Sequence, residues 1–124
     1  MSDSSDSKVL DALRQRTIEA YAAADVERSV GLYVDEAVQQ PPGRSAIVGR
    51  EAIGAAYRLL FAQGGLSLQM EAWDTVVARP EARERGAYRL AAGGQALLAG
   101  KYMFIARETA PGEWRYVWTT VTPD

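Results

Sequence analysis

The stretch DVERSVGLYVDEAVQQPPGRSAIVGREAIGAAYRLLF, residues 25–61, decides the fold. Asp25 is a helix-capping residue type and precedes a short segment with helical periodicity, so we expect a short helix after it. The segment AVQQPPGRSAIV predicts two short strands around a Pro-Pro-Gly turn. Gly49 then precedes a helix that we expect to run from Glu51 to about Gln63.

Upstream of this stretch the pattern is helical. Apolar and small residues recur at helical spacing over residues 7–24, which predicts a first helix. The preceding segment is acidic and serine-rich, and we expect residues 1–6 to form a disordered tail ahead of a single domain over residues 7–124.

Downstream the period changes from helical to alternating. Four strands are predicted, over residues 66–79, 82–91, 97–108 and 112–121, separated by turns that contain Gly or Pro. Helices followed by a run of antiparallel strands indicate an α+β fold.

Composition excludes several kinds of chemistry. The 124 residues contain no cysteine and no histidine, so neither thiolate catalysis nor a Ser-His-Asp triad is possible. Acid–base chemistry would have to come from Asp, Glu, Tyr or Lys. The net charge of −2 and the lack of a basic stripe argue against nucleic acid as a partner. No apolar run approaches the ~20 residues of a membrane span. We therefore expect a cytoplasmic protein with no membrane partner, no cofactor and no metal.

Three short motifs carry a resemblance to a known family. They are Leu32–Ala37, Pro41-Pro42-Gly43 and Val48–Ile53, in this order, with Gly100-Lys101-Tyr102 and Gly112-x-Trp114 further on. This arrangement resembles the nuclear-transport-factor-two-like (NTF2-like) superfamily, also called SnoaL-like or ketosteroid-isomerase-like, and is nearest to its small uncharacterised SnoaL-like branch. The resemblance implies a cone-shaped α+β barrel in which three N-terminal helices pack on a strongly curved antiparallel β-sheet. It also implies a small-molecule pocket and a homodimer through the sheet.

The resemblance does not extend to the known activities. Thr17 stands where the steroid-isomerase branch has a tyrosine, and Pro41 stands where that branch has its carboxylate base. The second acid of that branch would fall within residues 102–104, which contain no Asp or Glu. The epoxide-hydrolase branch needs Arg-x-Asp, which is absent, and the polyketide-cyclase branch needs a histidine. Whether the protein is an enzyme stays open.

Asp74 is the candidate catalytic residue. On the strand over residues 66–79 it shares the parity of Leu66, Leu68, Met70, Ala72 and Val76, and alternation would place these side chains on one face. A carboxylate on an apolar face is suited to general acid or base chemistry. The alternative is a bulge near Trp73 or an edge position, either of which would leave Asp74 solvated.

Aromatic and amide side chains are the candidate ligand contacts. They are Tyr21, Tyr33, Gln39, Tyr57, Phe61, Tyr102, Phe104, Trp118 and Thr119. Each aromatic residue among them could equally be ordinary core packing. The mixed charge run over residues 81–85 is interpreted as a solvated loop.

Three functions follow as hypotheses. The first is binding of a small, largely apolar or aromatic ligand in the cone. The second is a lyase, isomerase or hydrolase that uses Asp74 as general acid or base. The third is a homo-oligomeric interaction module.

Overall fold

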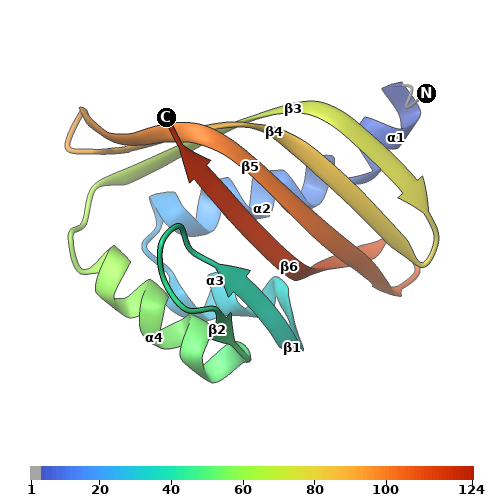
Figure 1. Ribbon diagram of the computed structural model, residues 1–124, viewed down its shortest axis with the longest axis horizontal. Coiled ribbons are helices and arrows are strands. Elements are labelled where there is room, and N and C mark those ends of the chain that lie inside the picture. Colours follow the sequence, from blue (N-terminus) through green and yellow to red (C-terminus); the bar gives the residue numbers. More distant parts are fainter. Residues whose placement is uncertain (1–3) are drawn as a thin grey trace.

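The computed structural model describes residues 4–124, and residues 1–3 of the expected tail lie outside this range. Helices come first and strands follow (Figure 1). The elements in chain order are α1 (Ser4–Val9), α2 (Asp11–Ala22), α3 (Val26–Gly31), β1 (Tyr33–Gln40), β2 (Ile47–Val48), α4 (Arg50–Phe61), β3 (Leu66–Ala78), β4 (Glu81–Ala92), β5 (Gln95–Ala110) and β6 (Glu113–Pro123). The α+β fold class predicted from the sequence is confirmed.

The strands form one curved sheet in the order β2-β1-β6-β5-β4-β3 (Figure 1). Strands β3 to β6 form a long antiparallel meander, and β1 and β2 are also antiparallel to each other. The β1–β6 pair, in contrast, is parallel, with Tyr33 beside Tyr116. After β2 the chain crosses through α4 to the far edge of the sheet, and the returning meander brings β6 against β1 in the same direction. The sheet is therefore mixed rather than wholly antiparallel.

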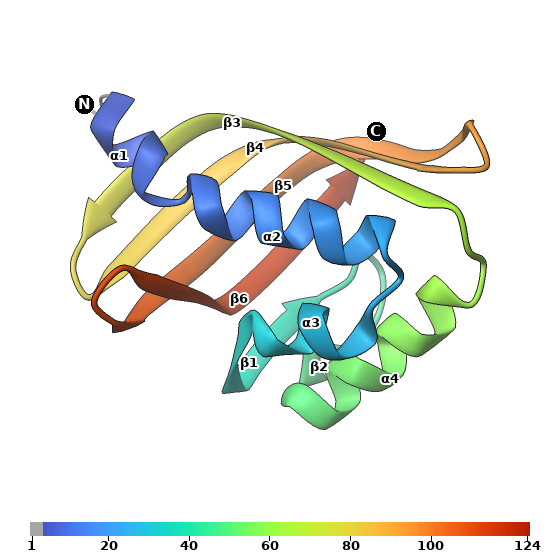
Figure 2. The ribbon, with the colours of Figure 1, turned by 180° about the vertical axis from the view of Figure 1, so that it is seen from behind.

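The helices lie on the concave side of the sheet, where α2 crosses it (Figure 2). The single helix expected over residues 7–24 is interrupted at Leu10, which is fully buried and separates α1 from α2. Ser4 already begins α1, so residues 4–6 of the expected tail are helical. No helix within residues 4–124 has the length and apolarity needed to cross a bilayer.

Helices α3 and α4 begin at the residue types that the sequence predicts for a helix start. The carboxylate of Asp25 accepts the backbone N–H of Arg28 at 3.1 Å and caps α3. Gly49 precedes α4 as its N-cap with a φ of +89°, a conformation that glycine adopts without steric cost. Ile53, Tyr57 and Phe61 then follow at intervals of four residues and bury one face of α4.

Candidate ligand-binding cavity

A cavity of about 240 Å³ lies between the concave face of the sheet and helices α2 and α4. Its walls come from β1, β3, β4, β5 and β6 on the sheet side, and from Thr17, Tyr21 and Tyr57 on the helix side. No Asp, Glu, Lys or Arg of the described chain lines it. The cavity is thus mostly apolar, with hydroxyl and amide groups as its polar features.

All six tyrosines of the chain line this one cavity. They are Tyr21, Tyr33, Tyr57, Tyr88, Tyr102 and Tyr116. Burial is the main cause that raises the pKa of every one of these hydroxyls above its ordinary value. At neutral pH the cavity therefore presents neutral phenols, which donate or accept hydrogen bonds and do not act as bases.

One hydroxyl cluster joins β1 to α4. The hydroxyls of Tyr33 and Tyr57 are 2.8 Å apart, and the Gln39 amide donates to the Tyr33 oxygen at 3.0 Å. The Tyr33 and Tyr57 rings also contact each other, with centroids 6.2 Å apart. This cluster joins three of the predicted ligand-contact residues, Tyr33, Gln39 and Tyr57.

A second hydroxyl pair joins α2 to β6. Thr17 Oγ1 lies 2.8 Å from the Leu13 carbonyl oxygen and 2.7 Å from the Tyr116 hydroxyl. A threonine hydroxyl has a single proton, and the Leu13 carbonyl can only accept. Thr17 therefore donates to Leu13 and accepts from Tyr116.

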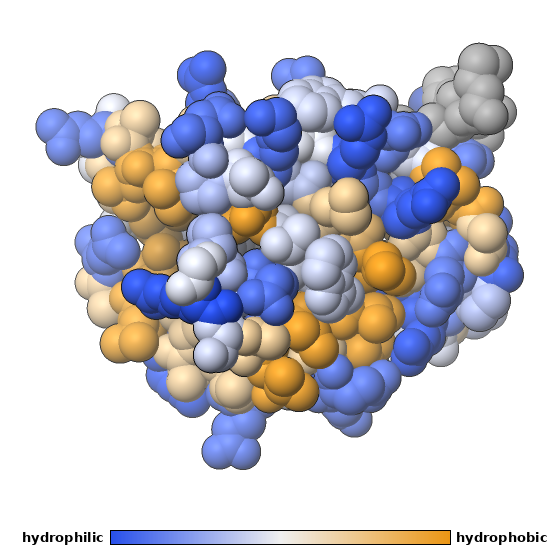
Figure 3. Space-filling model, in the orientation of Figure 1, coloured by the Kyte–Doolittle hydropathy of each residue, from blue (hydrophilic) through white to orange (hydrophobic). Residues whose placement is uncertain are grey.

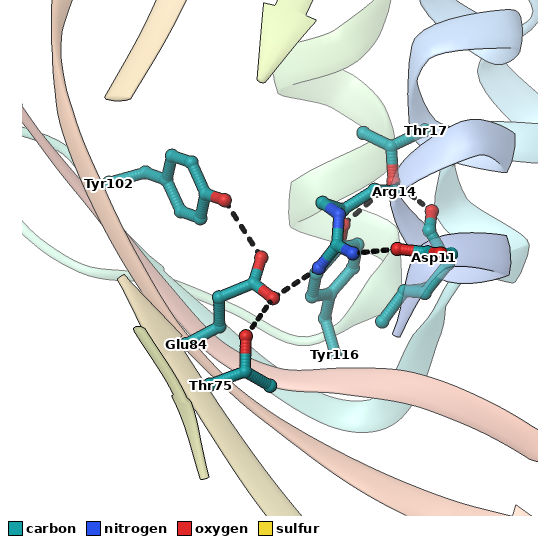
Figure 4. Close-up of polar contacts among 8 residues, drawn as sticks. Asp11, Arg14, Thr17, Thr75, Glu84, Tyr102 and Tyr116 are labelled. Carbon is teal, nitrogen blue, oxygen red and sulfur yellow. Dashed lines mark hydrogen bonds and ion pairs between the residues drawn. The ribbon is translucent and has the colours of Figure 1, made fainter. Parts of the chain in front are cut away.

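A buried carboxylate lies beneath the cavity wall (Figure 4). The Glu84 side chain is 0% exposed and forms an ion pair with Arg14. It also accepts hydrogen bonds from Thr75 at 2.9 Å and from the Tyr102 hydroxyl at 2.7 Å. Arg14 in turn contacts Asp11, one turn earlier on α2. Burial alone would lower the pKa of Arg14, but the charges of Glu84 and Asp11 outweigh it and raise this pKa, so Arg14 stays charged.

Gly86 gives Tyr102 the room to reach Glu84. It is opposite Tyr102 in the β4–β5 register, two residues after Glu84 on the same face. A Cβ at position 86 would lie 2.7 Å from the Tyr102 hydroxyl and 2.1 Å from the backbone oxygen of Glu71. The Tyr102 ring therefore crosses β4 only because residue 86 has no side chain.

Tyr88 differs from the other lining tyrosines. Its hydroxyl is buried and has no hydrogen-bond partner among the described residues. Buried hydroxyls are almost always paired in native proteins, because an unpaired one costs about 1–3 kcal/mol. Tyr88 thus provides an unused hydrogen-bond donor at the cavity.

Seven of the predicted ligand-contact residues line the cavity. They are Tyr21, Tyr33, Gln39, Tyr57, Tyr102, Phe104 and Thr119. Phe61 does not line it, because its ring packs against Tyr21 and Tyr57 behind the wall. Trp118 does not line it either, since it pairs with Ile105, which points away from the face that carries Phe104.

The prediction that Asp74 lies on the apolar face is wrong, and the alternative of a bulge near Trp73 is what the structure has. A bulge at Trp73 places two residues of β3 opposite one of β4, so that Asp74 pairs with Arg85. Asp74 is 45% exposed and its carboxylate lies 3.4 Å from the Arg85 Nε. The bulge turns Thr75 inward instead, and Thr75 is buried.

The interpretation of residues 81–85 as a solvated loop is also wrong, because they form the start of β4. Ala82, Glu84 and Gly86 are buried, while Arg83 and Arg85 are exposed. A sequence signal for this existed: Glu84 shares its parity with Ala82, Gly86, Tyr88 and Leu90. The strand predicted over residues 82–91 already included most of this run, but the burial of Glu84 was missed because a dense charge run is usually a solvated surface.

Comparisons with known proteins agree on the fold. No protein-family model matches the chain, and no curated protein matches it. Solved structures do match. A ketosteroid isomerase-like protein from Erwinia carotovora atroseptica is 22% identical, with 98% of each chain covered and a TM-score of 0.77. An NTF2-like protein with a cystatin-like fold from Novosphingobium aromaticivorans is 21% identical, with 94% of this chain and 80% of that one covered and a TM-score of 0.76. A conserved protein from Planctomyces limnophilus is 23% identical, with 98% and 100% covered and a TM-score of 0.78. The chain therefore has the NTF2-like fold, as its sequence motifs predicted.

Proposed function

We propose that the protein binds a small, uncharged, largely apolar or aromatic molecule in the tyrosine-lined cavity. The observation that carries this proposal is the set of six neutral tyrosines around one cavity that no charged side chain of the described residues lines. A charged ligand would lose its hydration without gaining an opposite charge there. A neutral ligand with a polar atom would keep its hydrogen bonds.

The size of the cavity supports a ligand of one or two rings. An apolar cavity of about 150 Å³ holds benzene, and this one measures about 240 Å³. Indane, a fused two-ring hydrocarbon, and 1-indanone, which adds a carbonyl oxygen, are suitable matched probes.

Titration with these two probes tests the proposal, followed by chemical-shift changes in the ¹H–¹⁵N NMR spectrum. We expect both to bind with a Kd below about 1 mM, equivalent to about −4.1 kcal/mol, and to shift cavity residues. Leu68→Phe adds bulk at a lining position and should weaken both probes. The matched control is Leu59→Phe, at an 80% exposed position on α4, which should leave binding unchanged. Absence of binding, or equal binding by both variants, would contradict the proposal.

Catalysis through Asp74 has less support than binding. The Asp74 carboxylate is paired with Arg85 outside the cavity, and the titratable groups that line the cavity within the described chain are tyrosines alone. A general base must be within hydrogen-bond reach of the proton that it removes. Binding without turnover is therefore the function that the geometry supports best.

A homodimer through the outer face of the sheet remains part of the proposal. Figure 3 shows hydrophobic side chains among charged ones on this face. Trp73 and Met103 are 47% and 46% exposed, and Trp118 and Ile105 pair on neighbouring strands. Light scattering on the protein as purified tests this: we expect the mass of two chains, and Met103→Glu should reduce it to one. A single-chain mass for the wild type would contradict the dimer, and larger assemblies would favour an interaction module.

A further inference from the structure

We propose that the end of the cavity formed by Tyr102 and Tyr116 accepts a hydrogen bond from an O–H or N–H group of the ligand. This inference rests on the proposed function and adds the chemical class of the ligand. We refer to these two hydroxyl oxygens as the acceptor end. Figure 4 shows the contacts of both hydroxyls, Tyr102 with Glu84 and Tyr116 with Thr17. The partners in these contacts determine where each hydroxyl proton goes.

The proton of Tyr102 is held by Glu84. A phenol has one O–H and can also accept, and the Tyr102 hydroxyl donates to Glu84 Oε2 at 2.7 Å. The other oxygen, Oε1, receives Arg14 and the Thr75 hydroxyl. A carboxylate held by a cation and two hydroxyls accepts in every one of these contacts. Any further contact of the Tyr102 oxygen must therefore be as an acceptor.

The proton of Tyr116 is held by Thr17. The only proton of the Thr17 hydroxyl goes to the Leu13 carbonyl oxygen at 2.8 Å, so the 2.7 Å contact between Thr17 and Tyr116 is donated by Tyr116. The Tyr116 oxygen is consequently also limited to accepting. Two separate hydrogen-bond networks, one through Glu84 on β4 and one through Thr17 on α2, thus leave both tyrosine oxygens as acceptors only.

The two tyrosines belong to one wall of the cavity. Phe104 lies between their rings: it stacks on Tyr102 with centroids 5.9 Å apart and meets Tyr116 edge-on at 4.9 Å. All three residues line the cavity. A flat ligand can lie on this aromatic wall while its O–H or N–H group reaches the acceptor end.

Tyr88 supplies a hydrogen-bond donor close to the acceptor end. Its hydroxyl proton has no partner among the described residues, so it can donate to a ligand. Tyr88 is opposite Gly100, two residues from Tyr102 along β5, which makes the two tyrosines diagonal neighbours. The cavity thus suits a ligand that carries both a hydrogen-bond donor and a carbonyl-type acceptor, such as a hydroxylated aryl ketone.

The test compares two probes of nearly equal shape, 5-indanol and 5-fluoroindane, with indane as the reference. Fluorine takes the place of the hydroxyl but cannot donate. For the wild type we expect 5-indanol to bind roughly fivefold or more tightly than 5-fluoroindane. In Tyr102→Phe/Tyr116→Phe, which keeps both rings, this preference should fall to about one while indane still binds. The unpartnered Tyr88 hydroxyl should make the wild type bind 1-indanone more tightly than indane. Tyr88→Phe should lose that preference and retain the preference for 5-indanol over 5-fluoroindane.

Each result has a distinct meaning. If indane binds but the wild type does not distinguish 5-indanol from 5-fluoroindane, the acceptor end is refuted and the proposed function stands. A preference that persists in Tyr102→Phe/Tyr116→Phe refutes it in the same way. If none of the probes binds the wild type, the proposed function fails and this inference fails with it.

Discussion

The guanidinium of Arg14 on α2 and the carboxylate of Glu84 on β4 form an ion pair inside the cone, although 70 residues separate them in the chain. The pair joins the helix to the concave face of the sheet. It also fixes Glu84 as the group that orients Tyr102. Stability and the polarity of the cavity therefore depend on the same carboxylate.

Glu84→Gln is expected to lower the free energy of unfolding by about 3 kcal/mol. Removing one partner of a buried ion pair leaves the other uncompensated, which costs about 3–5 kcal/mol, and the remaining contact of Arg14 with Asp11 places this case at the lower end. Urea unfolding followed by circular dichroism measures the change.

Asp74→Asn makes the same carboxylate-to-amide change at a half-exposed ion pair and serves as the control. Exposed pairs contribute about 0–1 kcal/mol, so its stability should stay close to that of the wild type, and probe binding should not change. Equal losses for the two variants would show that burial of Glu84 does not set its contribution.

The contrast between these two carboxylates also shows how far the sequence could predict the site. Alternation is a reliable guide along an unbroken strand, and for β4 it places Glu84 inward. On β3 the same rule fails at the bulge, because one extra residue at Trp73 reverses the faces that follow. From the sequence, a bulge near Trp73 was only an alternative, because no local residue pattern distinguishes it from an unbroken strand.

The fold itself was more predictable than the site. Helix and strand periods, the cap at Asp25 and the turn at residues 41–43 are local properties, and they gave the order of elements. The parallel β1–β6 pair and the Arg14–Glu84 contact depend on how distant segments meet. Arg14 and Glu84 each lie on an otherwise apolar face of their own element, and this was the one sequence feature that hinted at their contact.

Tyr88→Phe is expected to raise the free energy of unfolding by about 1 kcal/mol. The substitution removes a buried hydroxyl that has no partner among the described residues, so a desolvation cost disappears and no hydrogen bond is lost. Tyr102→Phe is the matched control. It removes a hydrogen bond to a charged group and should lower the same quantity by about 1.5–3 kcal/mol. Destabilisation by both variants would mean that the Tyr88 hydroxyl has a partner in solution.

Stability is expected to fall as the pH rises above 10. Burial raises the pKa of the six tyrosines above their ordinary value of 10, so above that pH the unfolded chain loses phenolic protons that the folded chain retains. Below pH 10 both states are protonated and this stabilisation is fully present. Each tyrosine can contribute up to about 1.4 kcal/mol per pH unit.

Urea unfolding between about pH 8 and pH 11 measures this dependence, and phenolate absorbance reports the protonation. We expect the absorbance to rise together with unfolding rather than before it. The chain in concentrated guanidinium chloride is the control and should titrate near pH 10. Phenolate absorbance that develops while the protein stays folded would contradict the burial of these hydroxyls.

Gly86→Ala is expected to destabilise the protein by about 2 kcal/mol or more and to disturb Tyr102. The added Cβ would lie 2.1 Å from the Glu71 backbone oxygen, which cannot rotate away, so the strands or the Tyr102 ring must shift. Gly31→Ala is the control, because nothing lies within 4 Å of its Cβ position, and it should be neutral or stabilise by up to about 1 kcal/mol. A shifted Tyr102 would lose its contact with Glu84, so Gly86→Ala should also weaken the preference for 5-indanol over 5-fluoroindane. Gly86→Ala that is as stable as the wild type and keeps that preference would show that Tyr102 does not need to cross β4 at this glycine.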